Sequence, residues 1–208
     1  MTELAPLSIE TEMKKLDDRI LGCTLCKLSE GRTLAVPGTG LIGSEVVFVG
    51  EAPGRNEDQE GKPFVGSGGK LLDELLKNAR LDRSSVYISN VVKCRPPNNR
   101  KPEDDEVRMC TSNYLEKQIA LLKPLLICTL GATALEYFTG MSKMGEAHGK
   151  LVKSRGGTPL LPTYHPAAIF RNPSYRELLQ EDLQKIPKIL EELKRGRSQT
   201  TLTEYQKP

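Results

Sequence analysis

The pattern of apolar and polar positions divides this chain into short buried strands separated by amphipathic helices. Apolar runs typical of strands buried on both faces occupy residues 46–50, 86–92, 125–130 and 159–164. Between them, apolar residues recur at helical spacing, and Ser67 is of a type that caps a helix. This alternation predicts an α/β fold: a three-layer sandwich with a central, mainly parallel four-stranded sheet flanked by helices.

Helices are also predicted near both ends of the chain and in its middle. Residues 8–21 carry apolar side chains at helical spacing, and Pro102 suits the first turn of another helix. The last helix spans about 175–194 and contains Pro187, which removes a backbone donor. We therefore expect Pro187 to kink that helix or to divide it in two.

Length and charge indicate one intracellular domain. The 208 residues suit a single domain over 1–195, and the polar residues 196–208 predict a disordered tail. With 30 Lys and Arg against 27 Asp and Glu, the net charge of +3 permits a polyanionic partner, but any DNA surface must be local. No apolar run approaches the roughly 20 residues that span a bilayer, so we expect the protein to stay inside the cell. We also expect a monomer, although no feature of the sequence specifies the oligomeric state.

Four of the five cysteines are candidate metal ligands. Cys23 and Cys26 form a C-x-x-C pair after the first helix, while Cys94 and Cys110 flank the exit of the second strand. Four thiolates suit zinc and an iron-sulfur cluster equally well, and independent buried cysteines are the alternative. Cys128 lies within the apolar strand LLICTL, so we expect it to be an unligated core residue.

Unusual side chains follow the ends of the predicted strands. In a parallel sheet, ligands bind beyond the carboxyl ends of the strands, where this sequence places Glu51, Glu57, Phe64 and His165, with Asn90 near the end of its strand at the same sheet edge. His165 is one of only two histidines. Carboxylates, an aromatic ring, an amide and an imidazole together predict a pocket of the size of a nucleobase.

Four segments, in order, carry a resemblance to a known family: GEAPG at 50–54, GKPF at 61–64, SNVVKCRPP at 89–97 and HPAA at 165–168. They resemble the uracil-DNA glycosylase superfamily, and the cysteine pattern is similar to that of its family four. The resemblance covers residues 23–190. It implies a four-iron four-sulfur cluster on the four cysteines, which holds loops together and takes no part in the chemistry, with zinc as the lesser alternative.

The resemblance also implies roles for three residues in a pocket that receives a flipped-out uracil. Phe64 would stack on the base. Asn90 would present a donor and an acceptor to O4 and N3–H, a pattern that cytosine reverses. His165 would stabilise the negative charge that develops on the base as the glycosidic bond breaks.

One departure from the superfamily concerns the attacking water. Ala52 stands where the first family of the superfamily has a water-activating aspartate. Glu51 and Ala52 would then line the uracil pocket, and Glu57 is the candidate for holding the water or the positive sugar. The wall near residues 51–54 is expected to exclude the methyl group of thymine.

The expected DNA contacts lie in two loops. Asn99 and Arg100 are candidates for binding phosphates, and residues 169–171, including Arg171, should enter the opened duplex. Uracil-containing DNA, single- or double-stranded, is the expected substrate. We predict a monofunctional glycosylase that leaves an abasic site; the alternatives are a glycosylase of the same fold for another damaged base, or a non-catalytic iron-sulfur domain that binds nucleic acid.

The tail contains a second candidate binding motif. Gln199, Leu202 and Tyr205 are spaced as in the peptide with which DNA enzymes bind the ring-shaped sliding clamp, although Gln206 replaces the second aromatic residue. Short patterns of this kind arise by chance. The sequence therefore makes clamp binding a hypothesis only.

Overall fold

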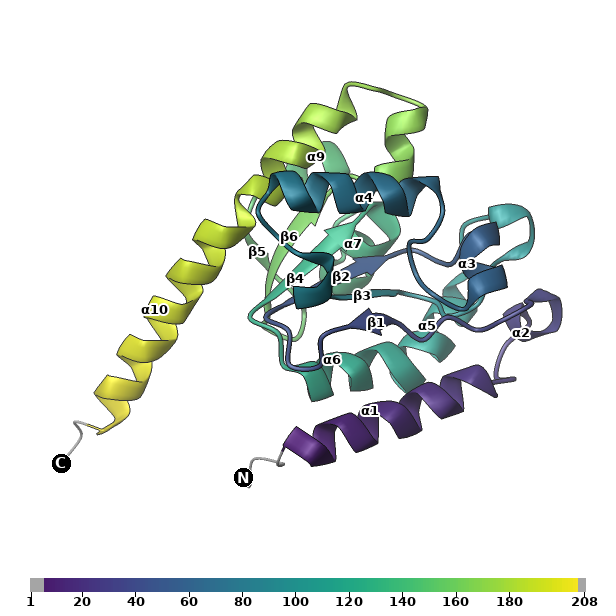
Figure 1. Cartoon of the computed structure of the whole chain (residues 1–208), viewed down its shortest axis with the longest axis horizontal. Helices are drawn as coiled ribbons and strands as arrows, with labels where there is room; N and C mark the ends of the chain where they lie inside the picture. The colour runs from purple at the N-terminus through teal and green to yellow at the C-terminus, as the bar shows by residue number, and fades with distance from the viewer. Residues whose placement is uncertain (1–5, 206–208) are drawn as a thin grey trace.

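The computed structural model describes residues 6–205, and the side-chain surroundings of residues 9–196. Its centre is one sheet with the strand order β1-β3-β2-β4-β6-β5 (Figure 1). The strands are β1 (Thr39–Gly40), β2 (Val46–Gly50), β3 (Tyr87–Asn90), β4 (Leu126–Leu130), β5 (Val152–Lys153) and β6 (Pro159–Thr163). The four long strands are the predicted ones, but the sheet has six, because β1 and β5 add an antiparallel edge strand on each side.

The four central strands are parallel. β2 pairs with both β3 and β4, and β4 pairs with β6, so all four carboxyl ends lie at one edge of the sheet. Both faces of these strands are covered, which explains their continuous apolar runs. Along β2, Val47 and Val49 pack into the core on one face, while Val46 and Phe48 pack into the core on the other.

Helices form the two outer layers (Figure 1). α1, α6 and α7 pack with the first of these cores, and α4 and α9 with the second. The three-layer sandwich is thus confirmed. The helices are α1 (Pro6–Leu21), α2 (Leu28–Gly31), α3 (Arg55–Glu60), α4 (Ser67–Asn78), α5 (Asp104–Cys110), α6 (Glu116–Leu122), α7 (Ala132–Thr139), α8 (Met144–Ala147), α9 (Tyr175–Gln184) and α10 (Ile186–Tyr205).

Two helix starts differ from the prediction. Gly66 is the N-cap of α4, so Ser67 is its first residue and not its cap. Pro102 lies before α5, whose N-cap is Glu103 in a capping box with Glu106. A local hydrogen-bonding arrangement, rather than the proline, therefore sets the start of α5.

A π-helical segment, η3 (Thr111–Leu115), joins α5 to α6 immediately after Cys110. Such segments are wider than an α-helix and are found mostly as single turns. Cys110 lies in the core on one side of η3, and Leu122 lies in the same core at the end of α6. The segment therefore accommodates an extra residue while both ends of this helical stretch face the same core.

The final helical region is divided near Pro187, as predicted. α9 ends at Gln184 and α10 begins at Ile186, with Lys185 between them. The expected tail at 196–208 falls partly within α10, which continues to Tyr205. The side chains from residue 197 onward lie outside the described part of the structure. None of the described helices is long and apolar enough to cross a membrane.

Candidate active site and cysteine centre

A cleft of about 530 Å³ lies at the carboxyl ends of the parallel strands. Segments far apart in the sequence converge on it, namely the loops after β2, β3, β4 and β6. It brings together all the predicted pocket residues: Glu51, Ala52, Glu57, Phe64, Asn90 and His165. Its volume is in the range that binds small ligands, about 300–1,000 Å³.

Asn90, the last residue of β3, presents an unsatisfied acceptor. Its side chain is buried, and its Oδ1 has no hydrogen-bond partner. A buried polar atom without a partner is rare in a folded protein and calls for an explanation, such as a missing ligand. The cleft that Asn90 lines supplies the place for that ligand.

Gly50, paired with Asn90 across the sheet, makes room for the two side chains beside it. A Cβ atom at Gly50 would lie 2.5 Å from Asn90 Oδ1 and 2.6 Å from Cζ of Phe64. Phe64 itself is buried and has a backbone φ of 54°, an angle that residues other than glycine rarely adopt. The amide and the ring are therefore held side by side at the end of the sheet.

His165 follows β6 and faces Phe64, with their ring centroids 5.6 Å apart. Its Nδ1 accepts a hydrogen bond of 3.1 Å from the backbone N–H of Ala167. Burial lowers the pKa of His165 to about 4, against the opposing charge of Glu57. The ring is therefore neutral near pH 7, and since Nδ1 accepts, the proton is on Nε2, which is a donor.

The two carboxylates of the cleft have different surroundings. Glu57 is bonded to main chain: Oε1 accepts from the N–H groups of Val65 and Gly66 at 2.9 and 2.8 Å, and Oε2 from that of Gly54 at 3.1 Å. Glu57 thus fastens the loop after β2 to the segment that follows Phe64. Glu51 accepts from the hydroxyl of Thr133 through Oε2 alone.

The three predicted DNA contacts all line the rim of the cleft. Arg171 is exposed. Arg100, however, forms two hydrogen bonds with the buried Glu106, at 2.7 and 2.8 Å, and this carboxylate raises the pKa of Arg100. Asn99 accepts from Nε of Arg95 at 2.8 Å. Arg171 is therefore the best placed of the three for a phosphate.

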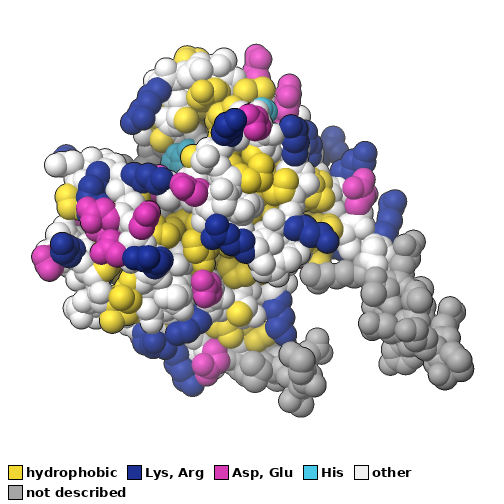
Figure 2. Space-filling model, turned by 180° about the vertical axis from the view of Figure 1, so that it is seen from behind, with side chains coloured by type: hydrophobic (Ala, Val, Ile, Leu, Met, Phe, Trp, Pro, Cys, Tyr) yellow, Lys and Arg dark blue, Asp and Glu magenta, His cyan; other side chains and the backbone are white. Residues whose placement is uncertain are grey.

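Figure 2 shows one face of the molecule, on which Lys and Arg side chains alternate with carboxylates and apolar groups. That face carries no extended basic surface. This agrees with the small net charge of +3.

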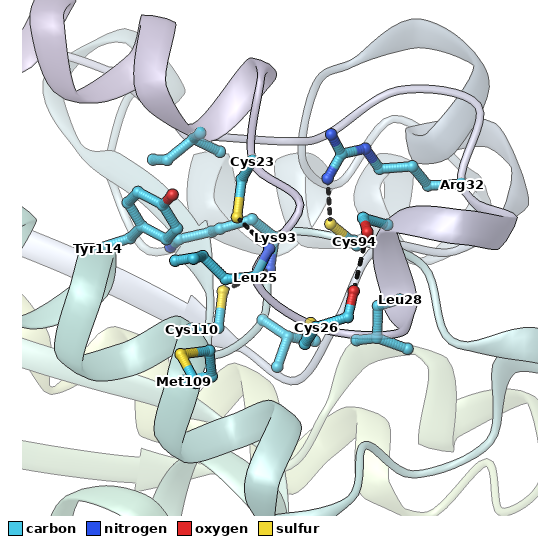
Figure 3. A pocket seen from close by; sticks show the side chains of 13 residues that line it. Cys23, Leu25, Cys26, Leu28, Arg32, Lys93, Cys94, Met109, Cys110 and Tyr114 are labelled. Atoms are coloured by element: carbon cyan, nitrogen blue, oxygen red, sulfur yellow. Dashed lines mark hydrogen bonds between the residues drawn. The ribbon is translucent and has the colours of Figure 1, made fainter.

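The four cysteines that were predicted to be metal ligands all line a second cavity, separate from the cleft. Cys23 and Cys26 come from the loop after α1, Cys94 from the loop after β3, and Cys110 from the end of α5. Figure 3 shows their sulfur atoms arranged around a common gap. No group of three or more His, Cys, Asp or Glu among the described residues is arranged to hold a metal ion.

Hydrogen-bond donors face these sulfur atoms (Figure 3). Arg32 Nη1 donates to Cys94 Sγ at 3.0 Å, and the backbone N–H of Lys93 donates to Cys110 Sγ at 3.3 Å. Burial raises the pKa of Cys26 and Cys94, and that of Cys110 to about 12. A cationic group or metal that favours thiolates is needed to deprotonate such thiols at neutral pH. Cys128 is fully buried in β4, away from this cavity, as predicted.

Four further residues shape the two sites, and their roles were not predicted from the sequence: Arg32, Gly50, Lys93 and Thr133. Gly50 belongs to the GEAPG segment, but the reason for its lack of a side chain is visible only in the fold. Lys93 follows a strand, where a lysine is usually exposed, yet its side chain is buried. Thr133 begins a helix, and its partner Glu51 is distant in the sequence.

Comparison with known proteins identifies the family. The model of the uracil DNA glycosylase superfamily matches residues 37–194. A type-4 uracil-DNA glycosylase from Sulfurisphaera tokodaii is 47% identical over 85% of this chain and 84% of its own. The chain belongs to the uracil DNA glycosylase superfamily.

Two further type-4 uracil-DNA glycosylases support its place in this branch of the superfamily. The protein from Thermotoga maritima is 43% identical over 85% of this chain and 93% of its own. The protein from Archaeoglobus fulgidus is 41% identical over 93% of this chain and 100% of its own. The similarity includes both the region of the cleft and that of the cysteines.

Proposed function

We propose that this superfamily member is a uracil-DNA glycosylase, which hydrolyses the bond between uracil and deoxyribose in DNA. The observation that carries the proposal is the unpaired, buried Oδ1 of Asn90 in a cleft that also contains Phe64 and the neutral His165. Uracil offers an N3–H donor to such an acceptor, whereas cytosine has no hydrogen on N3. The product would be free uracil and an abasic site.

Base flipping and stacking explain how the base reaches Asn90. The cleft lies at the surface, so the nucleotide must leave the duplex, which costs a few kcal/mol. Stacking on Phe64 recovers about 1–3 kcal/mol of this. Phe170, 61% exposed beside Arg171, is the side chain of the 169–171 segment that would enter the space left by the base.

His165 is the residue that would stabilise the leaving base. Negative charge develops on the uracil ring as the glycosidic bond breaks, and a donor already oriented toward O2 stabilises it without reorganisation. The Ala167 N–H fixes the tautomer, so that Nε2–H is the group that points to the ligand. A neutral imidazole retains its proton and acts through the hydrogen bond.

Of the two carboxylates, Glu51 is the better candidate for contact with the water or with the positive sugar. Glu57 already accepts three hydrogen bonds from main-chain groups, which favours a role in positioning Phe64 over the water-holding role predicted from the sequence. Glu51 uses one oxygen for Thr133 and stands next to Ala52, the position that lacks an aspartate. Exclusion of thymine by residues 51–54, which line the cleft, stays part of the proposal.

The test of this function uses a DNA oligonucleotide with a single uracil. Purified protein should release free uracil and leave sites that break only on alkaline treatment. His165→Ala should slow release about 100-fold or more, the usual effect of removing such a donor. His148→Ala is the matched control, because His148 does not line the cleft. Bound DNA with no released base would point to the non-catalytic alternative, and release of a different base to another glycosylase.

We further propose that Cys23, Cys26, Cys94 and Cys110 hold a four-iron four-sulfur cluster. Four thiols line one cavity, and N–H donors point at the sulfur atoms of Cys23, Cys94 and Cys110. Four cysteine thiolates with hydrogen bonds to their sulfur atoms are a ligand set of such clusters, and zinc is the lesser alternative. Its contribution would be structural, joining the loop after α1 to the loop after β3. Iron and sulfide analysis tests this: Cys23→Ser should lower both, while Cys128→Ala should leave both unchanged.

Clamp binding through Gln199, Leu202 and Tyr205 is a separate proposal, supported by their spacing at the end of α10. Deletion of residues 198–208 should abolish co-elution with a sliding clamp and leave uracil release intact. Clamp binding that survives the deletion would end the proposal. The same chromatography tests the predicted monomer.

A further inference from the structure

Lys93 has a position that neither the cleft nor the cysteine centre alone accounts for. It is 1% exposed, yet it carries an ammonium group, which is expensive to bury unless it is bonded. Its Nζ donates to the carbonyl oxygen of Asn90 at 2.8 Å and to Oγ of Ser89 at 2.6 Å. The buried cation therefore holds the end of β3 at Asn90, whose side chain lines the cleft.

The main chain of Lys93 also belongs to the cysteine cavity. Its N–H donates to Cys110 Sγ, and the next residue in the chain is Cys94. In Figure 3 Lys93 lies among the labelled cysteines that surround the cavity. A single residue thus contacts a thiol through its backbone and the Asn90 main chain through its side chain.

Lys93 Nζ donates two hydrogen bonds, and of these only the one to Asn90 acts on a residue whose side chain has no other polar support. Ser89 Oγ also donates to the carbonyl of Pro37 at 2.8 Å, so its position does not depend on Lys93. The side chain of Asn90 has no such second support, because its Oδ1 has no partner. The hydrogen bond from Lys93 Nζ to the Asn90 main chain therefore supports a residue whose side-chain amide is otherwise unsupported.

We propose that Lys93 is a positioning residue for uracil recognition, which holds the Asn90 main chain so that the side-chain oxygen faces N3–H of the base. This inference rests on the proposed glycosylase function. It explains why an ammonium group is retained in the core beneath the cleft. It also gives the cysteine centre a physical link to base recognition, since both depend on the segment from Ser89 to Cys94.

The test compares free uracil with 3-methyluracil as inhibitors of excision. The methyl group removes the N3–H that Asn90 would bind, so the ratio of the two inhibition constants reports on the orientation of Asn90. Lys93→Met keeps the length of the side chain and the backbone bond to Cys110 but removes the ammonium group. We expect this variant to lower the ratio of the inhibition constant of 3-methyluracil to that of uracil, and the single-turnover rate, by about 10- to 100-fold, the range for a lost hydrogen bond to a charged group.

Gln118→Leu is the matched control. Gln118 is fully buried in the same polar region: it donates to the Pro37 carbonyl at 3.0 Å and accepts a long hydrogen bond of 3.4 Å from Ser89 Oγ, but no hydrogen bond joins it to Asn90 or to Lys93. It should lower the melting temperature and leave the inhibitor ratio unchanged. If Lys93→Met does not fold, Lys93→Gln, which keeps a polar end in the same space, is measured in its place.

The outcomes separate this inference from the proposed function. A wild-type protein that releases no uracil overturns the function itself. An active wild type with an unchanged ratio in the Lys93 variant, or an equal loss in Gln118→Leu, reduces Lys93 to a structural role. A lower ratio of the two inhibition constants in the Lys93 variant alone supports the proposal.

Discussion

The neutral state of His165 leads to a quantitative prediction about acid stability. Its pKa is lowered by burial from the ordinary value of 6.5 to about 4. Between these two values the unfolded chain binds a proton at His165 that the folded chain does not bind. The free energy of unfolding should therefore fall as the pH decreases from about 6.5 to about 4, and this contribution is fully present above that range.

The magnitude follows from the same two values. At about pH 4.5 this difference in proton binding lowers the free energy of unfolding by about 2.5 kcal/mol relative to its value near pH 7. His165 is only half-buried by its surface exposure, so we expect about 2 kcal/mol once solvent screening is allowed for. That is a measurable part of the 5–15 kcal/mol typical of a domain.

Urea unfolding of wild type and His165→Asn, near pH 7 and at about pH 4.5, measures this contribution. The asparagine does not titrate, and its side-chain oxygen can still accept from the Ala167 N–H. Carboxylates titrate in both proteins, so the difference between their acid sensitivities isolates His165. Because the chain has only two histidines, an NMR titration with His148→Gln assigns the resonance of each. Equal acid sensitivity, with His165 titrating near 6.5, would refute the reasoning.

Three further substitutions test the rest of the site. Phe64→Ala should slow single-turnover excision roughly 5- to 150-fold through the loss of stacking; a rate within twofold of wild type would contradict this. Gly50→Ala places a methyl group 2.5 Å from Asn90 Oδ1 and should slow excision at least about tenfold, with the fold checked by circular dichroism. Arg32→Met removes the hydrogen bond to Cys94 Sγ and should speed the loss of the visible absorbance of the proposed iron-sulfur cluster in a chelator about 10- to 100-fold. A loss as slow as in wild type would exclude a role of Arg32 in retaining the cluster.

The central strands could be predicted because burial on both faces leaves an unbroken apolar run. β2 was predicted with its observed bounds, Val46–Gly50. β1 and β5 were missed because each has two residues, too few for any periodicity, and both exist only through pairing with a neighbouring strand. The start of α5 was misplaced because the capping box of Glu103 and Glu106 outweighed the proline signal.

The candidate site could be predicted as far as topology determines it. Asn90 ends one parallel strand and His165 follows another, and parallel strands bring their carboxyl ends together. The partners of each side chain were beyond prediction, since they depend on how loops fold against each other. Glu57 meets main-chain donors up to nine residues away, and Arg100 is held by Glu106. Lys93 was overlooked because a charged residue at a strand end is more often exposed.

The π-helical segment η3 lets the chain carry about one residue more than an α-helix would between Cys110 and Leu122, while both still face the same core. In an α-helix each residue turns the chain by about 100°, whereas a π-helix turns it by less per residue, so η3 turns the chain about as far as an α-helix that is one residue shorter. Deleting one residue inside η3 should therefore leave Cys110 at its cavity and α6 on the sheet. Deleting one residue inside α6 should instead turn the cysteine and the rest of the helix by about 100° relative to each other, which removes one of them from its buried position.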